Sequence, residues 1–473
     1  MPTKKVDLCI IGAGAGGLSV AAVASQLGVN TVLIENHKMG GDCLNYGCVP
    51  SKALLAAAKK VYSMKHATKL GVHTTGIEVN WQEVKAHIKA TIKTIEPHDS
   101  KERFEGLGVD VIFGNPTFID DKTVTVNQDE IKTKYFVIAT GSSASIAPIE
   151  GIDTVDYLIN ETIFDIDHLP EHLITIGAGP IGCELSQAFK LLGSEVTLID
   201  MGLLLPKDDH ELTDIIRQQL ISDGIRLYEK TNIISVKEDD NKEIIVTIDK
   251  DNQKKEIKGS HLLMATGRKA NVEKLKLEQA NIEYSKKGIP VDKRLRTNKK
   301  HIYAIGDVTG GLQFTHMAGF HAGIVIQNML FKLPKKHLTN ATPWVTYTEP
   351  ELAHVGPLFS ELQKQNPDIN IMSLSLSNND RAQAEKETNG KIKVAVDKKG
   401  HILAASIVSP CAGEMIYPWI MAVNENMKLS RITSIIAPYP SWGDISKRIA
   451  GNYYTPLLFS NKMKKLVRFL LKF

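Results

Sequence analysis

The stretch that decides the fold is Val6-Asp7-Leu8-Cys9-Ile10-Ile11-Gly12-Ala13-Gly14-Ala15-Gly16-Gly17. Its apolar start predicts a short buried strand, and the glycines that follow predict a tight turn into an Ala-rich helix ending near Leu27. A second strand is predicted from Thr31 to Glu35. Glycine at positions 12, 14 and 17 allows the turn, the close approach of a pyrophosphate and tight helix–strand packing. Glu35 follows Gly12 by 23 residues, which is the place of an acid that holds a ribose. The stretch therefore predicts a dinucleotide-binding unit.

The same pattern returns between residues 173 and 200. A strand is expected at 173–176, a helix from the glycine turn to about Leu192, and a strand at 195–200. The turn carries Gly177, Gly179 and Gly182, and Asp200 again follows the first glycine by 23 residues. A carboxylate here repels a 2′-phosphate, and no arginine lies between Ile199 and Glu211, which favours NADH over NADPH. Two units imply two dinucleotides, of which a flavin and a nicotinamide are the usual pair.

Composition limits the class of protein. A chain of 473 residues suggests about three domains, and 43% hydrophobic with 23% charged residues is ordinary for a globular protein. A net charge of +4 gives no reason to expect nucleic acid as a partner. Five cysteines are too few for a secreted disulfide scaffold, so we predict a cytoplasmic location.

Two of those cysteines lie close together, in Gly40-Gly41-Asp42-Cys43-Leu44-Asn45-Tyr46-Gly47-Cys48-Val49-Pro50-Ser51-Lys52. This spacing lets Cys43 and Cys48 close a disulfide, and in such a chain the pair is more often catalytic than structural. A helix predicted to begin just after Cys48, together with the charge of Lys52, would lower a thiol pKa. Zinc binding would need two further ligands, and the chain has no CxxC motif to supply them.

From residue 5 to about residue 450 the chain closely resembles the pyridine nucleotide-disulfide oxidoreductases of the dihydrolipoamide dehydrogenase, glutathione reductase and mercuric reductase type. The cysteine motif carries the resemblance, supported by Ala139-Thr140-Gly141, by Glu184 in the second glycine motif, by Ala265-Thr266-Gly267-Arg268 and by Ala304-Ile305-Gly306-Asp307. The resemblance implies an α/β fold with two Rossmann-like domains, for FAD and NAD, and a C-terminal α+β dimerisation domain in a homodimer. We expect residues 1–150 and 271–340 to form the FAD-binding domain in two segments, 151–270 the NAD(P)-binding domain, 341–450 the dimerisation domain and 451–473 a tail.

The resemblance also implies the chemistry and the roles of residues. Hydride would pass from NAD(P)H to FAD, then to the Cys43–Cys48 disulfide, and on to a disulfide or a soft-metal acceptor. Cys48 would face the flavin, Cys43 would meet the substrate, and Lys52 would pair with Glu184 near the nicotinamide. Asp307 would bind the ribityl chain and Thr315 would contact the flavin through its backbone. Further candidates for cofactor binding are Gly114, Thr140, Gly141 and Gly267.

One segment departs from the thiol-substrate members of the family. They carry His-Pro-x-x-x-Glu from the partner subunit, whereas this chain has Tyr439 in the place of the histidine and Asp444 in that of the glutamate. A tyrosine, with a pKa of about 10, is a poor proton shuttle at neutral pH, which argues against dihydrolipoamide chemistry. Mercuric reductase-like enzymes have tyrosine here but end in a cysteine pair, and this chain has no cysteine after Cys411. Dihydrolipoyl dehydrogenase and a mercuric reductase-like metal reductase both stay open. For Tyr439, packing at a dimer interface is an alternative, and for His316 a structural or flavin-contacting role.

The tail, residues 451–473, has no acid and five cations, Lys462, Lys464, Lys465, Arg468 and Lys472. In a helix, most of the cations share one face, and Met463, Leu466, Val467, Leu470 and Phe473 share another. A helix of this kind can lie on an anionic membrane surface, or its apolar face can pack on the enzyme or its dimer mate. A membrane-docked flavin reductase and a non-catalytic binding subunit are therefore further alternatives, although the intact Cys43, Cys48, Lys52 and Glu184 argue against an inactive subunit.

Overall fold

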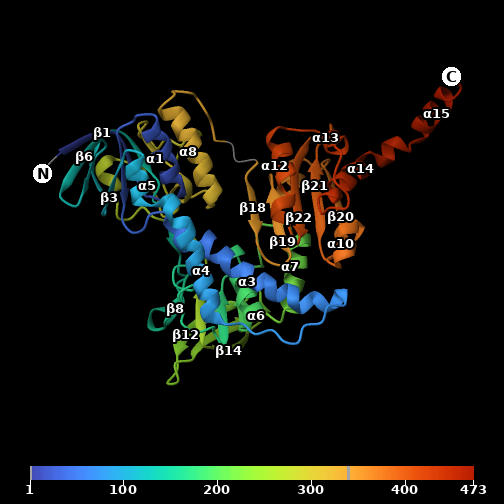
Figure 1. The fold of residues 1–473 in the computed structure, drawn as a ribbon, viewed down its shortest axis with the longest axis horizontal. Helices are drawn as coiled ribbons and strands as arrows, with labels where there is room; N and C mark the ends of the chain where they lie inside the picture. The colour runs from blue at the N-terminus through green and yellow to red at the C-terminus, as the bar shows by residue number, and fades with distance from the viewer. Residues whose placement is uncertain (1–2, 338–340) are drawn as a thin grey trace.

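The computed structural model describes residues 3–337 and 341–473, and in it the chain forms three units, each built around its own sheet (Figure 1). The first unit has a seven-stranded sheet in the order β3-β2-β1-β6-β5-β4, with β17 also paired to β6. The strands are β1 (Thr3–Ile11), β2 (Thr31–Glu35), β3 (Val109–Phe113), β4 (Thr117–Asp120), β5 (Thr123–Val126), β6 (Asp129–Ile138) and β17 (Ile302–Ala304). β1, β2, β3, β6 and β17 run parallel, whereas β4 and β5 form an antiparallel edge.

Both faces of the first sheet are covered, which explains why its central strands are apolar almost without interruption. On one face, Leu8 and Ile10 pack with side chains of α1 (Ala15–Gln26) and α8 (Thr315–Met329). On the other face, Cys9 and Ile11 pack with residues between 270 and 308. The chain thus returns to its first unit after completing the second.

The second unit has a five-stranded parallel sheet in the order β11-β10-β9-β15-β8. Its strands are β8 (Tyr157–Leu158), β9 (His172–Ile176), β10 (Glu195–Ile199), β11 (Arg226–Tyr228) and β15 (His261–Met264), with helices α6 (Pro180–Leu192) and α7 (His210–Ser222). An antiparallel sheet follows, of β12 (Asn232–Glu238), β13 (Ile244–Lys250) and β14 (Gln253–Gly259). The predicted repeat of two strand–helix–strand units is confirmed.

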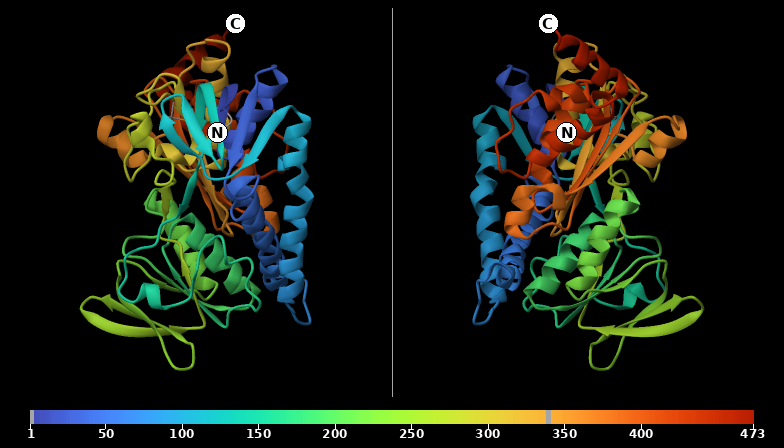
Figure 2. Two further views of the ribbon diagram at one scale, coloured as in Figure 1. Left: turned by 90° about the vertical axis from the view of Figure 1, so that its left-hand side faces the viewer. Right: turned by 90° about the vertical axis from the view of Figure 1, so that its right-hand side faces the viewer.

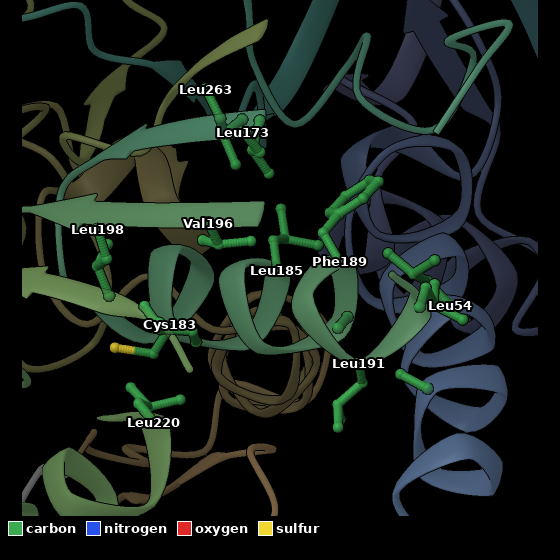
Figure 3. Close-up of a cluster of buried hydrophobic side chains, with 14 of the residues drawn as sticks. Leu54, Leu173, Cys183, Leu185, Phe189, Leu191, Val196, Leu198, Leu220 and Leu263 are labelled. Carbon is green, nitrogen blue, oxygen red and sulfur yellow. The ribbon is translucent and has the colours of Figure 1, made fainter. Parts of the chain in front are cut away.

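Two connections set the second unit against the first. β7 (Ser142–Ala144) pairs antiparallel with β16 (Arg268–Ala270), which brings together the chain segments that enter and leave the second unit. α3 (Cys48–His66) packs against α6, and Figure 3 shows Leu54 of α3 on the side of α6 from which Phe189 projects. α4 (Trp81–Ile95) adds Trp81, whose ring centroid lies 5.7 Å from that of Phe189. Figure 2 shows these two long helices alongside the second unit. The helix that begins at Cys48 is therefore fixed to both units.

The third unit is an antiparallel sheet in the order β18-β19-β22-β21-β20, packed by helices around the fully buried Trp419. Its strands are β18 (Pro343–Thr346), β19 (Glu351–Val355), β20 (Asn370–Ser375), β21 (Lys391–Val396) and β22 (Ile402–Ser409). The remaining helices of the chain are α2 (Gly41–Asn45), α5 (Lys101–Gly106), α9 (Phe359–Gln365), α10 (Asp380–Glu385), α11 (Ala412–Met415), α12 (Tyr417–Asn424), α13 (Leu429–Thr433), α14 (Asp444–Leu458) and α15 (Asn461–Leu470).

Candidate active site

The first glycine of each motif sits where another backbone segment crosses the turn. Gly12 has φ +105° and Gly177 has φ +107°, a region that side chains rarely enter. A Cβ on Gly12 would lie 2.4 Å from the carbonyl oxygen of Ala139, and one on Gly177 would lie 2.3 Å from that of Ala265. The motifs at 139–141 and 265–268, which supported the family resemblance in the sequence, are thus the segments that cross the two glycine turns.

The other glycines of the motifs have two different tasks. A Cβ on Gly17 or Gly182 would lie 1.9 Å or 1.8 Å from the carbonyl oxygen of the first glycine, so these positions permit tight helix–strand packing. A Cβ on Gly14 would have the Cα of Gly41 as its nearest neighbour, at 3.9 Å, and a Cβ on Gly179 would meet no described residue within 4 Å beyond its chain neighbours and its own helix. The middle glycines therefore leave open space at a helix N-terminus, as a pyrophosphate requires.

The acid at the end of the second strand is held in the same way in both units. The amide after the first glycine donates to the carboxylate, over 2.7 Å to Glu35 and 2.6 Å to Asp200. The other carboxylate oxygen accepts the amide two residues further along the chain, at 2.8 Å for Glu35 and 2.6 Å for Asp200. Both acids are fixed at the mouth of their turns, where a ribose would lie.

A single cleft of about 2150 Å³ joins the two turns and the cysteine motif. Most predicted site residues line it, namely Gly12, Gly14, Glu35, Cys43, Cys48, Lys52, Thr140, Gly141, Gly177, Gly179, Glu184, Asp200, Gly267, Asp307 and Thr315. Gly17 and Gly182 do not line the cleft. Gly114 does not line the cleft either, because it packs against Val126 and Asn127 and donates its amide to the backbone of Glu35.

The two cysteines are not joined by a disulfide, and their side chains are hydrogen-bonded to each other. Cys48 is the first residue of α3, whereas the sequence predicted a helix beginning just after it. A hydrogen bond from Cys43 lowers the pKa of Cys48 to about 6, and the Thr315 hydroxyl, 3.3 Å from the sulfur, and the charge of Lys52 act in the same direction against burial. The same hydrogen bond and burial raise the pKa of Cys43. Cys48 is therefore the thiolate and Cys43 holds the proton.

Lys52 and Glu184 form an ion pair between the first and second units. The Lys52 Nζ lies 2.7 Å from Glu184 Oε2, and the glutamate side chain is only 6% exposed. The backbone amide of Tyr347 donates to the other glutamate oxygen over 2.9 Å, and the Lys52 ammonium lies 4.5 Å from the centroid of the Tyr347 ring. Tyr347 was not predicted as a site residue; it lies between β18 and β19, the first two strands of the third unit's sheet.

A second polar network, also unpredicted, ties the cysteine motif to Asp307. Asp42 accepts a hydrogen bond from Asn160 over 2.9 Å and lies 3.3 Å from Arg268. Arg268 donates to Ser142 over 2.7 Å, and the Ser142 hydroxyl donates to Asp307 over 2.6 Å. The negative charge of Asp42 raises the pKa of both cysteines, so it opposes formation of the thiolate.

Two predicted residues lie away from the cleft of their own chain. Tyr439 is 69% exposed and donates its hydroxyl to Asp380 over 2.9 Å. Asp444 begins α14 and pairs with Arg448 over 2.7 Å. That this segment reaches the cleft of a partner subunit stays a prediction. His316, which lines the cleft, makes a 2.9 Å contact with the carbonyl oxygen of Pro343 and stacks on Phe314.

Among residues 3–337 and 341–473, no group of three or more His, Cys, Asp and Glu side chains is arranged to hold a metal ion. In the same residues, no helix combines the length and the apolar character needed to cross a membrane.

Comparison with known proteins identifies the chain's relatives. The family model described as pyridine nucleotide-disulphide oxidoreductase matches residues 6–322, and the model for the dimerisation domain of that family matches residues 342–448. Mercuric reductase from Lysinibacillus sphaericus is 34% identical over 437 residues, covering 92% of this chain and 80% of the relative. Dihydrolipoyl dehydrogenase from Bacillus subtilis is 30% identical over 449 residues, covering 92% and 96%.

Among solved structures, the Cu(II) complex of the HOCl-induced flavoprotein disulfide reductase RclA from Escherichia coli is similar with a TM-score of 0.84. It is 26% identical and covers 95% of this chain and 99% of its own. The matching dimerisation domain indicates a homodimer. This chain therefore belongs to the pyridine nucleotide-disulphide oxidoreductase family and is a flavin-dependent oxidoreductase that uses FAD and NAD(P)H.

Proposed function

We propose that the protein is an NADH-dependent reductase that delivers electrons through FAD and the Cys43–Cys48 pair to a thiophilic metal ion. One observation supports the redox role above all others. Cys48 has a pKa of about 6 and lies, with Cys43, in the cleft that joins the two glycine turns. A thiolate at neutral pH is both the nucleophile of thiol–disulfide exchange and a ligand for soft metals.

The residues of the chain fit both dinucleotides. Each motif leaves open space beside its middle glycine at a helix N-terminus, and each fixes an acid where a ribose would lie. Bound FAD would accept a hydride from the nicotinamide and supply an electron pair to the disulfide. Lys52 would place a positive charge beside the cofactors, and Thr315 would hold the Cys48 thiolate by a hydrogen bond. Asp200 favours NADH, because its carboxylate repels a 2′-phosphate.

Electrons and protons balance without another reactant. One NADH gives a hydride, which supplies two electrons and one proton, and the disulfide becomes a Cys43 thiol and a Cys48 thiolate. Two electrons then reduce one Hg(II) to Hg(0), or two Cu(II) to two Cu(I), as the disulfide forms again and one proton leaves. The metal is the substrate in this reaction.

A metal acceptor is favoured over a disulfide by the segment around Tyr439. A disulfide acceptor needs a proton for each thiol that leaves, and the Tyr439 hydroxyl, whose pKa is raised by its hydrogen bond to Asp380, is a poor donor near neutral pH. A metal ion needs no such proton. The relatives named mercuric reductase and the Cu(II) complex of RclA agree with this choice, and the relative named dihydrolipoyl dehydrogenase keeps a disulfide acceptor as the second candidate.

Anaerobic titration of the purified holoenzyme with NADH tests the redox role. We expect a long-wavelength thiolate-to-flavin band at two electrons, absent in Cys48→Ser. In Cys43→Ser, which has no disulfide to reduce, we expect the band before NADH is added and its loss as the flavin itself is reduced. Flavin reduction without this band would mean that the cysteine pair takes no part, and the protein would be a simple flavin reductase.

Acceptors added to the two-electron form then identify the substrate class. We expect Hg(II) or Cu(II) to return the enzyme to its oxidised form, with Hg(0) or Cu(I) released, faster than lipoamide does. Replacing Tyr439 by histidine should raise the rate with lipoamide and leave the rate with metal unchanged. If lipoamide reacts fastest in the unaltered protein, the disulfide candidate replaces the metal candidate.

A further inference from the structure

The C-terminal helix extends the chain away from the three sheets. α14 leads out of the third unit, Ser460 caps the next helix by accepting the amide of Met463, and α15 continues to Leu470 (Figure 1). Every residue from Lys464 to Phe473 is exposed. In the described chain, α15 therefore carries an apolar face that the rest of the protein leaves in contact with water.

That face consists of large apolar side chains that are exposed to water. It is formed by Leu466, Val467, Leu470 and Phe473 with the flanking Phe469, and the rings of Phe469 and Phe473 meet edge to face. The four side chains of the face itself are between 47% and 95% exposed. A contiguous exposed apolar surface of this kind marks a place of contact with a partner or a membrane.

The opposite face is rich in cations. Lys464, Lys465, Arg468 and Lys472 share it, Lys462 flanks it, and residues 445–473 contain no acid. The partner of this helix must therefore offer an apolar layer beside a negatively charged one. An anionic lipid surface offers both, because acyl chains take up the apolar face while the long lysine and arginine side chains reach the phosphates.

The alternative occupant, a second copy of the chain, fits the charges less well. Two tails would repel each other, and removing the five tail cations from the net charge of +4 leaves only −1 for residues 1–450. The body of the partner subunit thus has an excess of only one acid to attract the tail. A homodimer does, however, carry two tails, and two weak contacts with one surface strengthen each other.

We propose that residues 461–473 dock the enzyme on anionic membrane surfaces, with the apolar face of α15 entering the interface and its cations contacting lipid phosphates. This contact needs neither NADH nor an acceptor, so it stands or falls separately from the proposed function. It would hold the cleft near the membrane without a spanning segment.

Flotation of the purified holoenzyme with vesicles tests the proposal. We expect binding to vesicles of phosphatidylglycerol and phosphatidylcholine in equal parts, weak binding to phosphatidylcholine alone, and release at high salt. The triple variant Lys464→Gln, Lys465→Gln, Arg468→Gln should bind about a hundred-fold more weakly. A matched variant that removes three lysines elsewhere on the surface, Lys286→Gln, Lys287→Gln and Lys300→Gln, should bind as the unaltered protein does.

A second variant separates the apolar contact from charge alone. Leu466→Asn with Leu470→Asn keeps all five cations, and we expect a loss of binding of roughly a hundred-fold because two leucines no longer leave water. Retained flavin and unchanged NADH oxidation in solution show that each variant is folded. If the full chain floats no better than a chain ending at Ser460, or if the apolar variant binds as well as the unaltered protein, the proposal is wrong. A tail that changes the dimer dissociation constant or binds duplex DNA, without binding vesicles, would assign it to a second copy or to nucleic acid instead.

Discussion

The two dinucleotide-binding units have nearly the same backbone turn but differ in what lies over it. Both turns accept a backbone hydrogen bond from a later segment, from Gly40 to the carbonyl of Ala13 over 3.0 Å and from Leu205 to that of Ala178 over 2.9 Å. Only in the first unit does that segment, the cysteine motif, also cover the middle glycine of the turn, because Gly41 lies next to Gly14. In the second unit, the described residues leave the space around Gly179 open. A covered turn suits a cofactor that stays bound through many reaction cycles, and an open turn suits one that must exchange.

The assignment of cofactors follows from this difference. FAD would occupy the covered turn, where the cysteine motif that it reduces also lies, and NAD(P)H would enter the open one. The shared glycine fingerprint therefore specifies how a pyrophosphate is held, and the neighbouring chain decides how long the dinucleotide stays. Substitutions in the two units should separate these effects.

The largest effect is expected from a matched pair of glycine substitutions. In Gly17→Ala and Gly182→Ala the new Cβ would lie within 1.9 Å of a backbone oxygen, which we expect to cost about 3 kcal/mol or more. Gly17→Ala should lose flavin, whereas Gly182→Ala should keep flavin and lose NADH binding by more than about a hundred-fold. Flavin absorbance per chain after gel filtration and NADH titration measure both, with Gly451→Ala, where a Cβ meets open space, as the control. Equal loss of flavin in both variants would contradict the assignment.

The next largest effect concerns the ion pair that links the units. Lys52→Met leaves the buried Glu184 carboxylate without its cation, and we expect flavin reduction by NADH to slow by roughly a hundred-fold. Stopped-flow absorbance measures the rate. Lys59→Met removes another ion pair from the same helix, with Glu349 at 2.6 Å, but outside the cleft, so its flavin reduction should be unchanged. Similar slowing in both variants would point to a general loosening of α3.

A smaller effect is expected at the thiolate. With a pKa of about 6, Cys48 is ionised at pH 7, and the thiolate-to-flavin band should disappear as the pH falls through 6. Thr315→Val removes a hydrogen bond to the charged sulfur and should raise this pKa by about one unit. Thr315→Ser keeps the hydroxyl and should titrate as the unaltered protein does. A midpoint that is the same in all three proteins would show that the threonine hydroxyl does not bond to the thiolate.

The smallest effect sharpens the difference between covered and open turns. Gly41 has φ +59°, which costs alanine about 1 kcal/mol, and its Cβ would lie 2.7 Å from the Cα of Gly14. We expect Gly41→Ala to release flavin about five-fold faster in dialysis, with the affinity for NADH unchanged. A change in NADH affinity with flavin retained would mean that the turn covered by the cysteine motif binds NADH and not FAD.

The sequence predicted the units that depend on local pattern. Gly12, Gly14 and Gly17 with Glu35, and their counterparts in the second unit, could be found because the turn, the helix and the acid lie within one short stretch. α4 was missed although its signals are also local. Asn80 caps this helix by accepting two amides, and Val84, Ile88 and Ile92 recur at helical spacing.

Contacts between distant segments could not be predicted in the same way. The Thr315 hydroxyl reaches Cys48 across 267 positions of the chain, and Asp42 meets Arg268 only because β7 and β16 pair. The spacing of residues along the sequence does not predict contacts between segments that are so far apart in the chain. That Tyr439 reaches the cleft of a second subunit stays a prediction, because a single chain contains no partner.

Cys48 and Lys52 are carried on the same helix, and their separation is one helical turn. Because an α-helix advances about 100° per residue, one residue inserted between them would rotate the ammonium away from Glu184, and one residue removed would rotate it the other way. The number of residues between Cys48 and Lys52 thus determines whether the Lys52 ammonium can reach Glu184 while the sulfur stays in the cleft. A substitution at positions 49 to 51 keeps this spacing as long as the helix is kept, whereas an insertion or a deletion there changes it.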